Sequence, residues 1–184
     1  QLGLNLPFYE QYLRYLKGLV QGDLGRSYLQ KTEVAALIWS RLPASLLLMA
    51  GAIFSELAIG LTMGVIAVTQ RGTRTDNALM IFSFVGVSAP QFVIGILMLY
   101  VFAVKLGWFP IGGYGTFMHL VLPSLTLGLL GAGWYSRMMR SSLLDVLRQD
   151  YIRTARAKGL ARWKILLRHA MPNAILPSIA MIGI

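Results

Sequence analysis

The stretch PASLLLMAGAIFSELAIGLTMGVIAVT, residues 43–69, decides the fold class, and its single charged residue is Glu56. A helix needs about 20 apolar residues to cross the hydrocarbon core of a bilayer. Apolar side chains fill all sides of this segment and do not alternate with polar ones, which favours a membrane helix over a barrel strand. The sequence therefore predicts a membrane span over residues 43–69.

Two further stretches, residues 78–104 and 118–136, contain no Asp, Glu, Lys or Arg and are also predicted spans. A fourth apolar run, residues 170–184, would reach only about 22 Å as a helix, against a core of about 30 Å. We therefore expect residues 1–184 to form one transmembrane domain, an all-α polytopic membrane helix bundle with three full spans and the start of a truncated fourth. The missing initiator methionine at Gln1 also predicts a fragment.

Composition supports this class and excludes a soluble domain. The chain is 56% hydrophobic and 13% charged, whereas soluble domains have roughly 45 to 50% and about 25%. Its net charge of +10 is concentrated in residues 137–169, which hold nine basic and two acidic residues, so the pattern does not indicate nucleic-acid binding. There is no cysteine, and His119 and His169 have no neighbouring ligand at metal-binding spacing. We expect no metal site and no cofactor.

The distribution of basic residues also predicts orientation. Loops rich in Lys and Arg remain on the cytoplasmic side, so residues 137–169 are predicted to be cytoplasmic. Alternation then places residues 70–77 inside, and residues 105–117 and 1–42 outside. Within the external segment, aromatic and leucine residues recur at helical spacing over residues 8–19. This pattern predicts a short helix that either lies in the membrane interface or packs on other parts of the protein.

The basic loop contains a short segment with helix-ending signals at both ends, DYIRTARAKG, residues 150–159. Asp150 is predicted to be the N-cap, and Gly159 the left-handed residue after the helix. Ala155 and Ala157 are small enough for a partner to approach closely. The alternative is a solvated basic loop without a partner.

This segment resembles the cytoplasmic loop of permease subunits of ABC importers, in which Glu-Ala-Ala, three residues and Gly are followed by Pro thirteen residues later. Gly159 and Pro172 have that spacing, although Arg153 and Thr154 replace the family's Glu and first Ala. The sequence is most similar to the dipeptide, oligopeptide and nickel branch. Further agreeing stretches run nearly end to end: GDLGRS at 22–27, RLP at 41–43, SAPQF at 88–92, GWFP at 107–110, LPSLTLG at 122–128 and HAMPNAILP at 169–177.

The resemblance implies a subunit of about six spans in the cell inner membrane, which forms a translocation path for peptides or related small solutes. It implies four kinds of partner: two cytoplasmic ATPase subunits, a second permease subunit, an extracytoplasmic solute-binding protein and the lipid bilayer. The chain has no phosphate-binding loop, so it is expected not to be an enzyme, with ATP hydrolysis in a partner. The resemblance places ATPase coupling in the loop helix, at Arg153, Thr154, Ala155, Arg156, Ala157, Lys158 and Gly159.

Glu56 is the first candidate for the translocation path, because it is the only acidic residue in a predicted span and lies near its middle. Ala52, Gly60 and Gly64 share its helix face, so a neighbouring helix can approach closely and the carboxyl should point into the bundle. The carboxyl either attracts the ammonium group of a peptide or is protonated and hydrogen-bonded.

Pro90 and Gln91 are the second candidates. Pro90 lies mid-span and removes one helix hydrogen bond, which Ser88 or Gln91 could partly replace. The resulting kink is either a gating hinge or a static packing bend.

An ATP-independent channel or secondary carrier subunit is the alternative function. Such a protein should carry paired intramembrane charges or an inverted repeat, and neither is visible. Dipeptides, longer peptides, nickel chelates and glutathione are all open as substrates.

Overall fold

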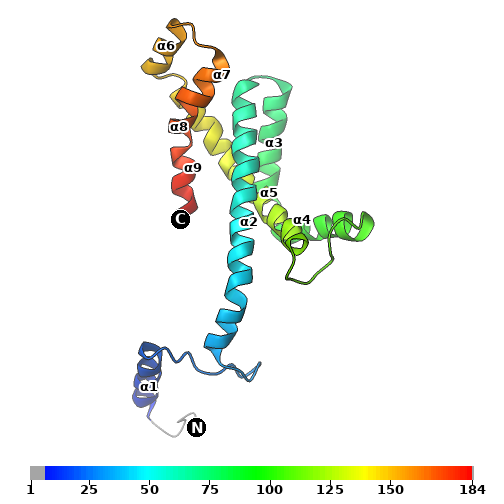
Figure 1. Ribbon diagram of the computed structural model, residues 1–184, viewed down its shortest axis with the longest axis vertical. Helices are drawn as coiled ribbons and strands as arrows, with labels where there is room; N and C mark the ends of the chain where they lie inside the picture. The colour runs from blue at the N-terminus through cyan, green and yellow to red at the C-terminus, as the bar shows by residue number, and fades with distance from the viewer. Residues whose placement is uncertain (1–6, 184) are drawn as a thin grey trace. The chain divides into compact units, whose positions relative to one another are not determined.

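The computed structural model describes residues 7–183 and confirms the all-α class. These residues contain no named strand, only an isolated bridge between Arg26 and Glu33. The chain divides into two units, residues 1–46 and 47–184, which we describe separately (Figure 1). The helices are, in order, α1 (Phe8–Val20), α2 (Val34–Thr69), α3 (Arg74–Ser88), α4 (Gln91–Met98), the π-helix η1 (Leu99–Lys105), α5 (Phe117–Val146), α6 (Asp150–Ala157), α7 (Arg162–Lys164), the π-helix η2 (Ile165–Ala170), α8 (Met171–Ala174), α9 (Leu176–Ala180) and the 3-10 helix η3 (Met181–Gly183).

The first unit contains α1 and the beginning of α2. The helix expected over residues 8–19 is present as α1, and its aromatic side chains are exposed. Its location in a membrane interface stays a prediction. The expected start of the first span at residue 43 does not mark the start of the helix, because α2 begins at Val34 and continues through Pro43. Proline is tolerated inside apolar membrane helices, so it does not end this one.

In the second unit, α2 crosses α5 at close range through glycines. A Cβ atom added to Gly60 would lie 2.8 Å from the backbone oxygen of Ala132, and one added to Gly64 would lie 2.8 Å from that of Ser136. Real Cβ atoms do not approach backbone oxygens so closely, and a larger residue would therefore force the helices apart. The close approach expected for the face of Gly60 and Gly64 is confirmed.

The second predicted span, residues 78–104, is not one continuous helix. Its axis turns through 107° between α3 and α4, so that α4 runs across the direction of α3 (Figure 1). Ala89 adopts the extended conformation favoured before proline, and Pro90 starts the next helix as its N-cap. The expected kink is therefore a complete interruption. By length and apolar content, α2 and α5 can cross a membrane, and the bent pair is a third candidate.

The helix over the third predicted span, residues 118–136, is longer than expected. α5 continues to Val146, so the first ten residues of the predicted loop 137–169 are helical. Arg137 and Arg140 lie within this extension and have partners on α3, described below. The predicted fourth run, residues 170–184, consists of short helical pieces separated at Ile175 within the described residues.

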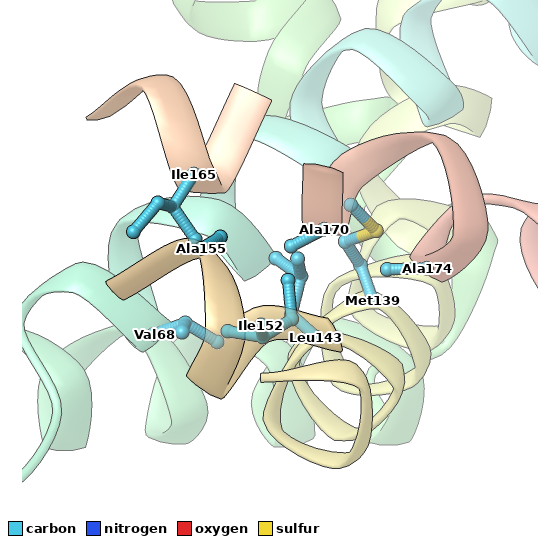
Figure 2. Packing of buried hydrophobic residues seen from close by; sticks show 8 residues of the cluster. All are labelled: Val68, Met139, Leu143, Ile152, Ala155, Ile165, Ala170 and Ala174. Carbon is cyan, nitrogen blue, oxygen red and sulfur yellow. The ribbon is translucent and has the colours of Figure 1, made fainter. Parts of the chain in front are cut away.

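A cluster of buried apolar side chains packs around α6 (Figure 2). Its side chains come from α2, α5, α6, η2 and α8, so five elements that are separate in sequence meet at one place. The cluster consists of Val68, Met139, Leu143, Ile152, Ala155, Ile165, Ala170 and Ala174.

Candidate functional site

The ends of α6 are defined by its backbone more than by side chains. The N-cap is Gln149, not Asp150 as expected; Asp150 lies in the first turn, where a negative charge is favourable. At the other end Gly159 has φ +74°. Its N–H donates to Arg156 O at 2.9 Å, and Leu160 N–H donates to Ala155 O at 3.3 Å. This is a Schellman motif, and the left-handed role expected for Gly159 is confirmed.

Replacing Gly159 by valine should loosen α6, since a β-branched residue at positive φ costs roughly 1 to 2 kcal/mol. We expect amide hydrogen exchange in the last turn of α6 to become about 5 to 30 times faster in the assembled permease. Gly112→Val is the matched control, because Gly112 does not have a positive φ and nothing lies near its Cβ position. Equal exchange in both variants would show that the left-handed cap does not stabilise α6.

The two faces of α6 differ in chemistry. Ile152 and Ala155 point into the core cluster, with exposed fractions of 0% and 6%. The expectation that Ala155 leaves room for a partner is therefore wrong, because its small side chain is used for packing within this chain (Figure 2). The other proposed coupling residues are exposed: Arg153, Thr154, Arg156, Ala157, Lys158 and Gly159.

The buried face of α6 connects it to the apolar helices. Ile152 and Ala155 belong to the same cluster as Val68 at the end of α2 and Leu143 near the end of α5. A polar contact adds to this packing, because the Asn173 amide donates to the Tyr151 hydroxyl at 2.8 Å. A force applied to the exposed face of α6 would therefore reach α2, α5 and α8 through direct contacts.

A buried ion pair joins α3 to α5, and sequence reasoning missed it. Arg140 donates from Nε to Asp76 Oδ1 at 2.9 Å and from a terminal nitrogen to Oδ2 at 2.8 Å. The Gly72 N–H donates to the same Oδ2 at 3.1 Å, and Asp76 N–H donates to the N-cap hydroxyl of Thr73 at 3.4 Å. Asp76 precedes the predicted span 78–104, and its hydrogen bonds from Arg140 hold its pKa below the usual value for aspartate. The sequence feature that could have drawn attention to Asp76 is its position three residues after Thr73, which is the spacing of a helix-capping pair.

Arg137, one turn before Arg140, is held by a different set of contacts. Its guanidinium lies 4.9 Å from the ring centroids of both Phe84 and Trp134, and it donates to Ser83 O at 3.3 Å. Both arginines at the end of α5 therefore have partners within this chain.

Glu56 faces α5, as expected from the small residues on its helix face. A Cβ atom on Gly131 would collide with the Glu56 carboxylate, so the absence of a side chain at Gly131 provides the space that the carboxylate occupies. The cleft that Glu56 lines does not include Pro90 or Gln91. Those two residues lie at the break between α3 and α4, where the Gln91 side chain makes no hydrogen bond to other described residues.

Among residues 7–183, no group of three or more His, Asp or Glu side chains could hold a metal ion. The features that remain are the anchored helix α6, the Asp76–Arg140 pair and the cleft beside Glu56.

Comparison with known proteins places this geometry in a family. Residues 57–184 match the family described as the binding-protein-dependent transport system inner membrane component. The chain belongs to that family. This match covers α3 to α9, including α6 and both helices of the buried ion pair. The family and the apolar helices together establish a multi-pass protein of the inner membrane.

Individual relatives agree with the family. The chain is 41% identical over 193 residues to the oligopeptide transport system permease protein AppB of Bacillus subtilis, covering 99% of this chain and 61% of that protein. It is 40% identical over 184 residues to the glutathione transport system permease protein GsiC of Escherichia coli K12, covering 100% and 60%. A putative peptide permease protein of Brucella ovis is 41% identical over 194 residues, covering 100% and 61%. The chain thus spans about 60% of the length of these relatives.

Proposed function

We propose that this chain is the membrane-spanning part of a subunit of an ATP-driven importer for peptides or related small solutes. The relatives named above are permeases of oligopeptide, glutathione and peptide transport systems, which supports this substrate class. The single observation that carries the coupling role is the construction of α6, which has a buried apolar face and an exposed basic one.

In this proposal, α6 fits into a cleft of a cytoplasmic ATPase subunit and moves with it. Its anchoring side chains Ile152 and Ala155 pass the motion to α2 and α5 as a rigid body, because packed cores resist continuous deformation. The ion pair of Asp76 with Arg140 makes α3 follow α5. The helices that line the path are thereby moved together when the ATPase closes.

The proposed assembly has two cytoplasmic ATPase subunits, a second permease subunit and an extracytoplasmic solute-binding protein, all acting at the inner membrane. ATP hydrolysis takes place in the ATPase partner, and the family of this chain is one of transport components, not of enzymes. No finding supports the alternative of an ATP-independent channel or carrier.

Cysteine crosslinking in the complete importer tests the docking of α6. Residues 1–184 contain no cysteine, so a replacement here is unique within this part of the subunit, and any cysteines elsewhere in the importer are replaced first. Ala157→Cys and Lys158→Cys, on the exposed face, should each form a disulfide with a cysteine placed in the ATPase cleft. Thr116→Cys, at the N-terminal end of α5 and on the predicted opposite side of the membrane, should form none.

Ala155→Cys provides a second and more demanding control. It lies on the same short helix but faces the core, so it should crosslink at least several-fold less than Ala157→Cys. Equal products from both positions, or none from either exposed position, would contradict docking through this face of α6.

A further inference from the structure

A cleft in the second unit lies beside the Glu56 carboxylate. It has a volume of about 400 Å³, within the range of small-molecule sites. Aromatic and aliphatic side chains form its other walls, and the carboxylate is its only formal charge. The lining residues are Ile53, Glu56, Trp134, Tyr135, Met181 and Ile182.

Glu56 has no hydrogen-bond or ion-pair partner among residues 7–183. The cations nearest in sequence to the cleft residues of α5 are Arg137 and Arg140, and neither lines the cleft or forms an ion pair with Glu56, although Arg137 stacks on the cleft residue Trp134. Arg140 binds Asp76, while Arg137 donates to a backbone oxygen of α3 and stacks against two rings. A carboxylate within an apolar span is costly unless it faces a partner or water-filled space. Residues 7–183 therefore supply no counter-ion for the carboxylate in this cleft.

Trp134 supplies an aromatic wall that is held in place. The Arg137 guanidinium lies against its ring with 4.9 Å to the centroid, and yet Trp134 is 56% exposed. Tyr135 beside it is buried, with an exposed fraction of 8%. The Glu56 carboxylate is positioned by contact with Gly131. The carboxylate and the aromatic side chains are thus both fixed by neighbours before any ligand arrives.

We propose that this cleft binds a primary ammonium group, namely the charged amino terminus of a peptide during its passage. A carboxylate gives an ammonium group a charge-assisted hydrogen bond, and an aromatic face attracts the same cation through its quadrupole. The available volume suits the first residue of a peptide, which leaves the rest of the molecule free to move on. This inference rests on the proposed function for the identity of the peptide, whereas the affinity of the cleft for ammonium stands on its geometry.

The reactivity of a cysteine in the cleft tests the site directly. In the complete importer, Ile53→Cys is treated with cationic 2-aminoethyl methanethiosulfonate and with neutral methyl methanethiosulfonate, and the ratio of the two rates is measured. The cationic reagent should be favoured, and Glu56→Gln should lower that ratio about tenfold or more, because it removes the charge and keeps the side-chain size. Asp145→Asn, which removes an exposed carboxylate from α5, the helix that Glu56 faces, should leave the ratio unchanged.

Protection by peptides completes the test. Trialanine should slow the labelling of Ile53→Cys at a concentration about tenfold lower than N-acetyltrialanine, and Glu56→Gln should remove this difference. An unchanged rate ratio, or equal protection by both peptides, would overturn the proposal. So would a cysteine inert to both reagents, which would mean that a segment of the complete subunit covers the cleft.

These outcomes are distinguishable from failure of the proposed function. If the wild-type importer takes up trialanine but Ile53→Cys shows no preference for the cationic reagent, the ammonium site is contradicted and the peptide importer is not. Cation preference without trialanine uptake would leave the site and contradict the peptide importer.

Discussion

Replacing Arg140 by leucine is expected to destabilise the folded permease by about 3 to 5 kcal/mol. The Asp76 side chain is only 4% exposed, so it would lose both hydrogen bonds from Arg140 and remain as a buried charge with little access to water. The measurement is thermal unfolding of the assembled permease in detergent, compared with the wild type at the same pH.

Three controls separate the pair from a general effect of mutation. Asp76→Leu should cost less, because the Arg140 side chain is 26% exposed and can reach water. The double variant should recover much of the loss, since two apolar residues leave no unpaired charge. Arg153→Leu, which breaks the exposed pair with Asp150 at 3.4 Å, should cost under about 1 kcal/mol. A double variant as unstable as Arg140→Leu would contradict the assignment.

The pH dependence of this loss follows from the pKa of Asp76. Hydrogen bonds from Arg140 lower that pKa in the folded protein. The pair therefore contributes fully above the pKa of about 3.9 for an unfolded aspartate, and the contribution is lost as pH falls through the lower folded value. The contribution of the pair to wild-type stability should accordingly stay constant from about pH 8 to pH 5, whereas the deficit of Arg140→Leu should shrink as pH falls and its unpaired, buried Asp76 takes up a proton.

Ala155→Trp is expected to have the second largest effect. It is informative when compared with Ala157→Trp, which places the same side chain on the exposed face of α6. A tryptophan at Ala155, which is only 6% exposed, must fit into the core cluster, and should cost more than about 3 kcal/mol and prevent assembly. Ala157→Trp should leave the melting temperature nearly unchanged, because Ala157 is exposed, yet block approach of the ATPase.

The two variants are compared by membrane abundance, melting temperature and ATPase rate in the reconstituted importer. The expected contrast is an unstable protein for Ala155→Trp and a stable but uncoupled one for Ala157→Trp. If Ala157→Trp hydrolysed ATP at the normal stimulated rate, α6 would not dock through its exposed face.

Sequence alone predicted the helical class and the close approach of a neighbouring helix to the face of Gly60 and Gly64. Both follow from local rules: apolar runs of sufficient length indicate helices in lipid, and glycines four residues apart, such as Gly60 and Gly64, share one helix face. The left-handed Gly159 was predictable for the same reason, since helix C-termini favour glycine after the last turn.

Features that depend on contacts between distant residues were not predictable in this way. Asp76 and Arg140 are 64 positions apart, and each looked like an ordinary loop charge. Ala155 faces inward because η2 and α5 pack on it, and one sequence does not specify the arrangement of those partners. Pro90 indicated a kink, but hydropathy cannot give the size of a bend.

The interruption at Pro90 has a consequence for hydration. Ala89 N–H still bonds to Val85 O, and Val93 N–H bonds to Pro90 O, but the amides of Gln91 and Phe92 donate to no backbone oxygen among residues 7–183. Lipid tails offer such groups no acceptor, so unpaired backbone at membrane depth must face protein or a water-filled space. The predicted span 78–104, which contains no charged residue, therefore includes a joint whose free amides need an acceptor from protein or from water, a requirement that its hydropathy does not reveal.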